Sequence, residues 1–470
     1  MKSPKRLLSL FLAALLTVLS LPAAPAYGAS AVPKLEAEAA MVIDMTTGDI
    51  LYKQNEEQMI YPASTTKLVT ALIALDKLDM SATLVADQEV AATLGTSLKL
   101  KDGEEINAKD ALNVLLVASC NDCAVLIAKA IAGSTYEFVN MMNDKLLELG
   151  VSNTHFSNPH GLHAEDHYST ASDLAKIAMI CMEDPRFAQI VAQAEYTVPA
   201  TNKSEQRTVL STNLLLNDET DTNRIYVDNE LRYCKYEGAM GVKTGYTKAA
   251  GGCLIEAAQK GDTRILTVVM KSSSMGRFAD TIKLLDWAFA NFRTVECTHE
   301  GSVLEGYVKV KNGAFNKVGV RVQDTIFYTI PSEAADSIIT TRLTLDASTK
   351  APVEEGRVLG VLEVYESGLK VGSTNVVATE AIEKGGILSV FGIEDHTAKI
   401  IWTSLIAAVV AIVALLTGYV IYMRRKIRRK KAEKAARARA RKEEELRRRQ
   451  MWDRDYDRAR YGKQDDEDRY

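Results

Sequence analysis

Cysteine is scarce in this 470-residue chain. The six are Cys120, Cys123, Cys181, Cys234, Cys253 and Cys297. In a large domain, so few cysteines do not indicate a disulfide framework. Cys120 and Cys123 form a C-x-x-C motif, but their neighbours lack the second pair of cysteines or histidines that a zinc site needs. We interpret both as small helix residues, and a bond between them stays open.

The body of the protein has no net positive charge. The formal net charge is -4, although residues 424–450 alone hold fifteen basic and four acidic side chains. The body is therefore acidic, which argues against nucleic-acid binding there. No internal repeat is visible, and low complexity is confined to the tail. We predict no nucleic-acid partner; binding by the basic tail is the alternative.

The N-terminal end has the pattern of a secretory signal. Lys2, Lys5 and Arg6 precede an apolar run, Leu7–Leu21, and small residues suited to cleavage follow. This order predicts a signal peptide over residues 1–29. A membrane anchor is the alternative, and the short run argues against it.

The second apolar run, Ile400–Met423, holds no charge over 24 residues, enough to cross a bilayer with some tilt. Basic residues from Arg424 follow at once, which places that side in the cytoplasm. We predict a single-pass protein of the cell membrane with a transmembrane helix at 400–423, an extracytoplasmic body and a cytoplasmic tail at 424–470, basic and then of mixed charge. The tail forms a charged helix beside anionic lipid or stays solvated, and from Met451 onward we expect disorder. A buried core helix is the alternative for the span.

The body mixes strand-like and helix-like segments. A two-strand hairpin is predicted over 39–54, and further strands over 239–246, 252–258 and 264–271. Helical patterns cover 65–78, 106–117, 124–131, 171–182 and 277–292. After Arg293, short alternating segments recur at 306–311, 317–322, 324–329, 338–345 and 357–365, with no long helical period. Residues 294–396 therefore form a small all-β domain, a sandwich or partial barrel.

Three polar motifs occur in order along the body: Ser64-Thr65-Thr66-Lys67, Ser119-Cys120-Asn121 and Lys243-Thr244-Gly245. Ser64 and Lys67 stand three residues apart at a helix start, so both lie on one face. A Ser-x-x-Lys sequence alone is weak evidence, because chance supplies it often. All three motifs in this order are strong evidence for a nucleophilic site.

A serine hydroxyl is a poor nucleophile at neutral pH, so it needs a base within hydrogen-bonding distance. Lys67 can serve if its amine is partly neutral; burial and the nearby charge of Lys243 lower a lysine pKa. Ser64, at a helix N-terminus, also gains from the helix dipole as negative charge develops. Taken alone, the Ser64-Thr65-Thr66-Lys67 motif has an alternative interpretation, in which Ser64 caps the helix and Lys67 is an ordinary surface lysine.

The other motif residues suit a peptide substrate. Ser119 can relay a proton between Lys67 and a leaving amine, and Asn121 can bind a backbone amide and hold Lys67. Lys243 and Thr244 suit a terminal carboxylate. Gly245 lets the ligand approach the backbone. The substrate would lie along that strand by β-addition.

These motifs resemble those of serine-type D-alanyl-D-alanine carboxypeptidases, the low-molecular-weight penicillin-binding proteins. The stretches 158–162 and 167–171 are also similar to a region typical of that family. The resemblance implies an α+β, β-lactamase/DD-peptidase-like catalytic domain over 30–293, with an antiparallel sheet and flanking helices. It implies removal of the terminal D-alanine from peptidoglycan stem pentapeptides through an acyl-Ser64 intermediate, inhibition by β-lactams, and no cofactor or metal. The backbone N–H groups of Ser64 and Tyr246 would form the oxyanion hole, and Arg277 would assist the carboxylate site.

Two features depart from the family pattern. Cys120 stands where the middle residue of Ser-x-Asn is commonly Gly. The C-terminal segment looks like a span, whereas the family usually anchors through an amphipathic helix lying on the membrane. Neither departure removes a catalytic group.

Other functions are less well supported. A class A β-lactamase would need a deacylating glutamate, and no Glu-x-x-Leu-Asn sequence occurs between Asn121 and Lys243. A non-catalytic wall-binding scaffold is opposed by the intact motifs, whereas the balance of hydrolysis against transpeptidation stays open. His155, His160, His163 and His167 fall within a window that could suggest a metal. Their spacing through a Pro-Gly loop favours a hydrogen-bonded structural loop.

Overall fold

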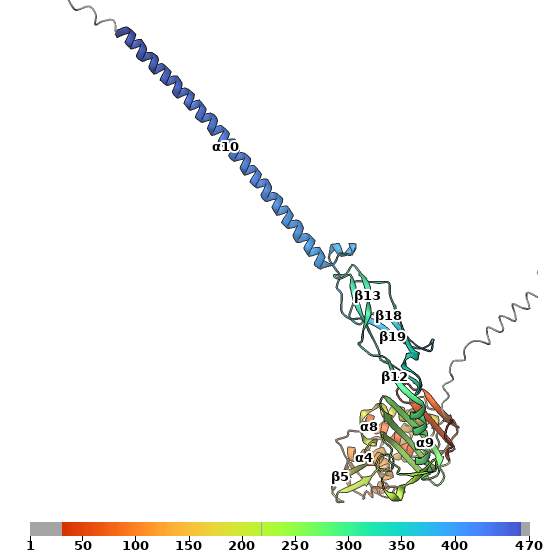
Figure 1. Cartoon of the computed structure of the whole chain (residues 1–470). Coiled ribbons are helices and arrows are strands. Elements are labelled where there is room, and N and C mark those ends of the chain that lie inside the picture. Colours follow the sequence, from red (N-terminus) through yellow and green to blue (C-terminus); the bar gives the residue numbers. More distant parts are fainter. Residues whose placement is uncertain (1–30, 218, 462–470) are drawn as a thin grey trace, which may run out of the picture. The chain divides into compact units, whose positions relative to one another are not determined.

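The computed structural model describes residues 31–217 and 219–461 (Figure 1). The signal peptide predicted over 1–29 and the end of the tail, 462–470, lie outside the described residues. The chain folds into two compact units. The first holds the chain up to Ser302 with Val322–Thr344 and Val361–Asn375, and the second holds Val303–Arg321, Leu345–Gly360 and the chain from Val376.

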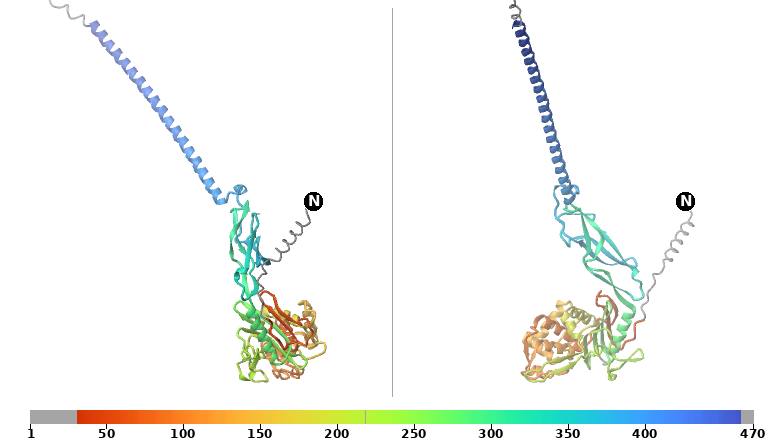
Figure 2. Two further views of the ribbon diagram at one scale, coloured as in Figure 1. Left: turned by 45° about the vertical axis from the view of Figure 1, so that its right-hand side comes forward. Right: turned by 60° about the vertical axis from the view of Figure 1, so that its left-hand side comes forward.

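A five-stranded antiparallel sheet forms the centre of the first unit (Figures 1 and 2). Its order is β2 (Ile50–Gln54), β1 (Ala39–Asp44), β11 (Thr263–Ser272), β10 (Gly251–Lys260) and β9 (Ala239–Thr247). The hairpin over 39–54 and the three later strands agree with the sequence prediction. Because β9 is the last strand, one of its edges is not paired within this sheet.

The sheet is buried on both faces, so its strands carry apolar side chains on both sides. Met41 and Ile43 of β1 belong to one core cluster, which contains the helices, whereas Ala40 and Val42 belong to a second cluster with α9 (Gly276–Asn291). The period of two residues in a strand produces this division. The predicted α+β class with flanking helices is confirmed.

The helices of the first cluster hold the first two motifs. They are α2 (Lys67–Lys77), α4 (Ala108–Val117), α5 (Asn121–Ala132), α6 (Thr135–Glu148), α7 (Ala171–Glu183) and α8 (Pro185–Val191). Side-chain caps define several starts: Asn107 accepts from Lys109 N, Ser134 from Glu137 N and Thr170 from Asp173 N. Gly133, in the left-handed conformation, ends α5.

Shorter elements complete the first part of the chain. They are η1 (Ala63–Thr66), α3 (Gln88–Ala91), η2 (Asp221–Asn223) and the strand pairs β3 (Thr83–Val85) with β4 (Glu105–Asn107), β5 (Glu195–Val198) with β6 (Arg207–Leu210), and β7 (Ile225–Val227) with β8 (Glu230–Arg232). The predicted helix over 65–78 begins as the 3-10 turn η1 and becomes α-helical at Lys67.

After α9 the chain is rich in short strands, as predicted. They are β12 (Phe292–Thr298), β13 (Val303–Lys311), β14 (Lys317–Val322), β15 (Ile326–Pro331), β16 (Ile339–Leu345), β17 (Ser348–Lys350), β18 (Val358–Glu366) and β19 (Leu369–Ala378), with η3 (Asp336–Ile338) and η4 (Ile387–Phe391). Within the second unit, β13 pairs with β14 antiparallel and with β17 parallel. The sequence did not predict β12, β17 or β19.

The predicted span lies inside one continuous helix, α10 (Asp395–Tyr461). It is long and apolar enough to cross a membrane, and no other helix in the described ranges meets that test. The expectation of disorder from Met451 is wrong up to Tyr461. Within this part of the helix, Trp452 stacks on Tyr456 one helical turn away; just before it, Arg448 pairs with Glu444.

Candidate active site

The first motif brings a serine and a lysine into contact. Ser64 lies in η1 and Lys67 is the first residue of α2. Thr65 and Thr66 fix the turn, because their hydroxyls donate to the carbonyl oxygens of Pro62 and Ala63, each at 2.8 Å. Lys67 Nζ lies 2.9 Å from Ser64 Oγ.

The hydrogen bonds of Lys67 suit a neutral amine. Nζ donates to Asn121 Oδ1 and to the carbonyl oxygen of His160, each at 2.7 Å. Nζ thus has three polar atoms in reach, and a neutral amine that donates to Asn121 and His160 would turn its lone pair to Ser64 Oγ. The Asn121 amide is held with its oxygen toward Lys67, because Nδ2 donates to the carbonyl of Leu94 at 2.7 Å.

Burial also favours the neutral form of the Lys67 amine. The Lys67 side chain has no solvent exposure. This burial, and next the charge of Lys243, lower its pKa well below the ordinary lysine value. Lys67 is therefore a buried lysine of lowered pKa whose Nζ is in contact with Ser64 Oγ.

The second motif lies at the junction of α4 and α5. Ser119 has a positive φ of 61°, a conformation that costs a non-glycine residue energy and is often found at functional sites. Its hydroxyl is buried and has no hydrogen-bond partner among the described residues. A buried hydroxyl without a partner is available to a substrate or to a transferred proton.

The two cysteines of the C-x-x-C motif are free and buried. Cys120 is the N-cap of α5, and Cys123 lies inside that helix. Burial raises the pKa of Cys120 to about 12 and that of Cys123 well above its ordinary value. Both are therefore thiols that pack as small residues, in agreement with the sequence interpretation.

The third motif lies on the edge strand β9. Lys243 Nζ donates to the carbonyl of Thr244 at 3.0 Å, and the Thr244 hydroxyl lies 2.5 Å from that of Thr212. Gly245 packs closely, because a Cβ there would lie 3.0 Å from the Pro62 carbonyl oxygen and 3.1 Å from Ser64 N, so the neighbouring backbone would have to shift slightly. The strand therefore runs directly against the nucleophile turn.

Two more predicted residues stand beside Gly245. Arg277, near the start of α9, donates from Nη1 to the Gly245 carbonyl at 2.8 Å. Tyr246 follows on β9 with a side chain 55% exposed. Burial, and next the charge of Arg277, lower the pKa of Lys243 to about 7.

The structure adds a loop that the motif analysis did not place at the site. Asn158 Oδ1 accepts from Gly161 N at 2.7 Å, and the Thr70 hydroxyl donates to the Pro159 carbonyl at 2.6 Å. These bonds fix the turn that presents the His160 carbonyl to Lys67. The available signal was the Asn-Pro-His-Gly sequence, which favours a tight turn.

The histidine window is a hydrogen-bonded structural loop, as interpreted. His167 Nδ1 accepts from Ser157 N at 3.0 Å, and its Nε2 lies 2.7 Å from the Thr66 hydroxyl. Because Thr66 donates to Ala63, His167 donates from Nε2. Burial lowers the pKa of His160 to about 3 and that of His167 to about 4, so both are neutral near pH 7.

Comparison with known proteins identifies this arrangement. The family model of D-alanyl-D-alanine carboxypeptidases, peptidase family S11, matches residues 27–274. The chain belongs to this family. Residues 292–384 match the C-terminal domain of penicillin-binding protein 5.

Curated relatives of this carboxypeptidase cover most of its length. The carboxypeptidase DacF of Bacillus subtilis is 32% identical over 361 residues, which are 75% of this chain and 88% of the relative. The carboxypeptidase DacD of Salmonella typhimurium is 32% identical over 400 residues, 81% of this chain and 96% of the relative. The crystal structure of penicillin-binding protein 5 from Haemophilus influenzae is 27% identical, with a TM-score of 0.60, and the match covers 75% of this chain and 99% of that one. The protein is a serine-type D-Ala-D-Ala carboxypeptidase of a family that acts on peptidoglycan peptides.

Proposed function

We propose that this protein removes the terminal D-alanine from peptidoglycan stem pentapeptides through an acyl-Ser64 intermediate. The observation that supports this most directly is the buried Lys67 amine, whose Nζ lies 2.9 Å from Ser64 Oγ and also donates to Asn121 Oδ1 and to the His160 carbonyl. Such an amine can act as the general base for the serine.

The positions of these groups support the following proposed reaction. Ser64 Oγ attacks the carbonyl of the penultimate residue while its proton passes to Lys67. The backbone N–H groups of Ser64 and Tyr246 stabilise the oxyanion. The C–N bond then breaks, and the terminal D-alanine leaves with a proton relayed through Ser119. Water hydrolyses the ester and frees Ser64; a β-lactam would acylate the same oxygen.

The substrate would lie along the free edge of β9. Asn121 would bind a backbone amide of the peptide, whereas Lys243 and Thr244 would hold the terminal carboxylate beside Gly245. Arg277 would act by holding the Gly245 carbonyl and by adding positive charge. Hydrogen bonds to the strand edge suit an extended peptide, and the carboxylate site favours a chain end.

We also propose that residues 400–423 anchor the enzyme in the cell membrane, with residues 30–293 as the catalytic domain and 294–396 as the β domain outside the cytoplasm. The apolar part of α10 supports the anchor. The basic residues that follow it support a cytoplasmic tail at 424–470.

The central test is D-alanine release from a pentapeptide muropeptide by the full-length protein in detergent. Ser64→Ala is expected to lower the rate by about 10³-fold or more, since it removes the nucleophile. Ser152→Ala, at an exposed serine, is the matched control and should leave the rate unchanged. Normal release by Ser64→Ala, or a penicillin adduct on another residue, would overturn the proposal. Rapid turnover of a chromogenic cephalosporin with little D-alanine release would instead identify a β-lactamase.

The carboxylate site predicts a pH dependence. Because the pKa of Lys243 is about 7, this lysine loses its charge as the pH rises through that value. The KM for a peptide with a free C-terminal carboxylate is therefore expected to rise between pH 6 and pH 9, by roughly tenfold for one lost charge contact. A C-terminally amidated peptide, which makes no such ion pair, is the control. A KM that rises equally for both peptides would remove Lys243 from the carboxylate site.

A further inference from the structure

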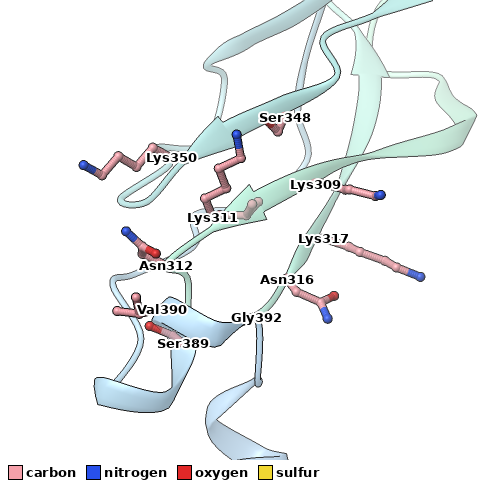
Figure 3. A pocket seen from close by; sticks show the side chains of 11 residues that line it. Lys309, Lys311, Asn312, Asn316, Lys317, Ser348, Lys350, Ser389, Val390 and Gly392 are labelled. Atoms are coloured by element: carbon pink, nitrogen blue, oxygen red, sulfur yellow. The ribbon is translucent and has the colours of Figure 1, made fainter.

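A pocket lies in the β domain, away from the catalytic residues in sequence. It has a volume of about 660 Å³, and four lysines line it (Figure 3). Lys309 and Lys311 stand two apart on β13 and so share a face. Lys317 of β14 is directly opposite Lys309, and Lys350 of β17 is directly opposite Lys311. Residues paired in this way lie on the same face, so the four lysines form one basic surface, the lysine pocket.

Like charges on directly opposed residues of a sheet are destabilising. Among the described residues, no ion pair joins a carboxylate to any of the four lysines. Lys317 Nζ lies over the Tyr307 ring, 4.1 Å from its centroid. Glu394, at the rim, already accepts from Asn316 N at 3.3 Å. A surface that keeps this much uncompensated charge favours an anionic ligand.

An exposed apolar turn borders the lysine pocket. Ser389, Val390 and Gly392 line it, and they belong to η4 or follow it. Ile387, Val390 and Phe391 of η4 are 88%, 67% and 77% exposed. Three large apolar side chains on one short turn suit insertion into the interfacial region of a bilayer, about 5–10 Å deep.

The start of α10 is joined to the rim of the pocket. Asp395 N donates to the Ala314 carbonyl at 3.0 Å, and Asp395 Oδ1 accepts from Gly386 N at 2.8 Å. The apolar run begins at Ile400, about 7–8 Å further along the helix at the standard rise. With residues 400–423 as the proposed span, the rim of the lysine pocket would lie close to the membrane surface.

We propose that the lysine pocket binds the phosphate of an anionic phospholipid while η4 inserts among the acyl chains. This inference rests on the proposed anchoring by residues 400–423 and is independent of the acyl-serine chemistry. A soluble anionic wall polymer would offer the same phosphodiester chemistry. The lipid is favoured because the exposed apolar turn and the apolar run of α10 adjoin the pocket.

The test uses the full chain in nanodiscs, with a phosphatidylglycerol probe that carries a photoreactive headgroup. Cross-linked peptides are identified by mass spectrometry, and tail peptides from 424–450 serve as the internal reference. Lys309→Gln with Lys311→Gln is expected to lower labelling of the pocket peptides roughly thirtyfold, as two surface cations are lost. Lys77→Gln with Lys109→Gln removes the same charge from the catalytic domain and should change nothing.

Each outcome is decisive. Equal labelling by a phosphatidylcholine probe, or unchanged labelling in the pocket variant, would overturn the lipid site. Preferred binding of soluble poly(glycerol phosphate), with loss of lipid labelling, would assign the pocket to a wall polymer and also overturn it. D-alanine release, measured on the same samples, tests the proposed carboxypeptidase function separately. The lipid site can therefore be overturned while the proposed function stands, and the reverse.

Discussion

Lys67→Arg is expected to lower the rate of Ser64 acylation by about 10³–10⁴-fold, because it replaces the proposed neutral general base with a fixed positive charge. A guanidinium stays protonated and has no lone pair for the serine proton. In the native protein, burial and the charge of Lys243 hold the pKa of Lys67 well below the ordinary value. The amine can therefore accept the proton at neutral pH.

The measurement is the rate of covalent labelling by a fluorescent penicillin, with thermal unfolding as a check on folding. Lys109→Arg, at an exposed lysine of α4, is the matched control. In the wild type, acylation should slow as the pH falls and Lys67 becomes protonated. Lys67→Arg should remain slow across the same range. If Lys67→Arg kept a tenth of the native rate, another group would be the base.

The sequence predicted the site well where a motif carries its own chemistry. Ser64, Lys67 and Asn121 are in direct contact, and Gly245 lies against the Ser64 turn. Their roles stay predictions that the proposed experiments test. The contact between Ser64 and Lys67 could be predicted because a Ser-x-x-Lys motif lies within one helix turn. The contacts of the other motifs could be predicted because their order along the chain matches that of a known family of active sites.

The rest depends on contacts between distant segments. The bond from Lys67 to the His160 carbonyl uses a backbone atom, which leaves no residue-specific trace in the sequence. The contact between Thr212 and Thr244 joins ordinary residues 32 positions apart. The helix α6 escaped notice because much of its surface is polar, with Phe138, Met142 and Leu146 as its buried residues.

The length of helix α10 beyond its apolar segment was also not predicted. The composition from Met451 predicted disorder, because it is charged and poor in apolar residues. A prediction from composition alone does not consider helix propagation. Once a helix exists, each further residue that joins it adds one hydrogen bond. The apolar segment supplies that existing helix, and α10 continues to Tyr461.

Gly161→Ala should produce a large loss of stability for a local reason. Gly161 has φ +88, and a Cβ there would lie 1.8 Å from the Ala63 carbonyl oxygen. That oxygen belongs to rigid backbone beside Ser64, so either the loop or the serine turn has to move. We expect the free energy of unfolding to fall by roughly 3 kcal/mol, from the left-handed conformation together with the overlap. Acylation should slow by about 10²-fold, since the His160 carbonyl and Ser64 would be displaced.

Gly48→Ala is the matched control, because Gly48 has φ +79 and a Cβ added there would meet nothing within 4 Å. The Gly48→Ala variant has only the cost of the left-handed backbone conformation, so its free energy of unfolding should fall by about 1 kcal/mol. Its acylation rate should be unchanged. Urea unfolding of the full chain in detergent, followed by tryptophan fluorescence, measures the free energy of unfolding. Penicillin labelling measures the rate of acylation. Equal losses in the two variants would show that the loop yields to the added methyl group. The position of the His160 carbonyl would then not depend on the close packing of Gly161 against the serine turn.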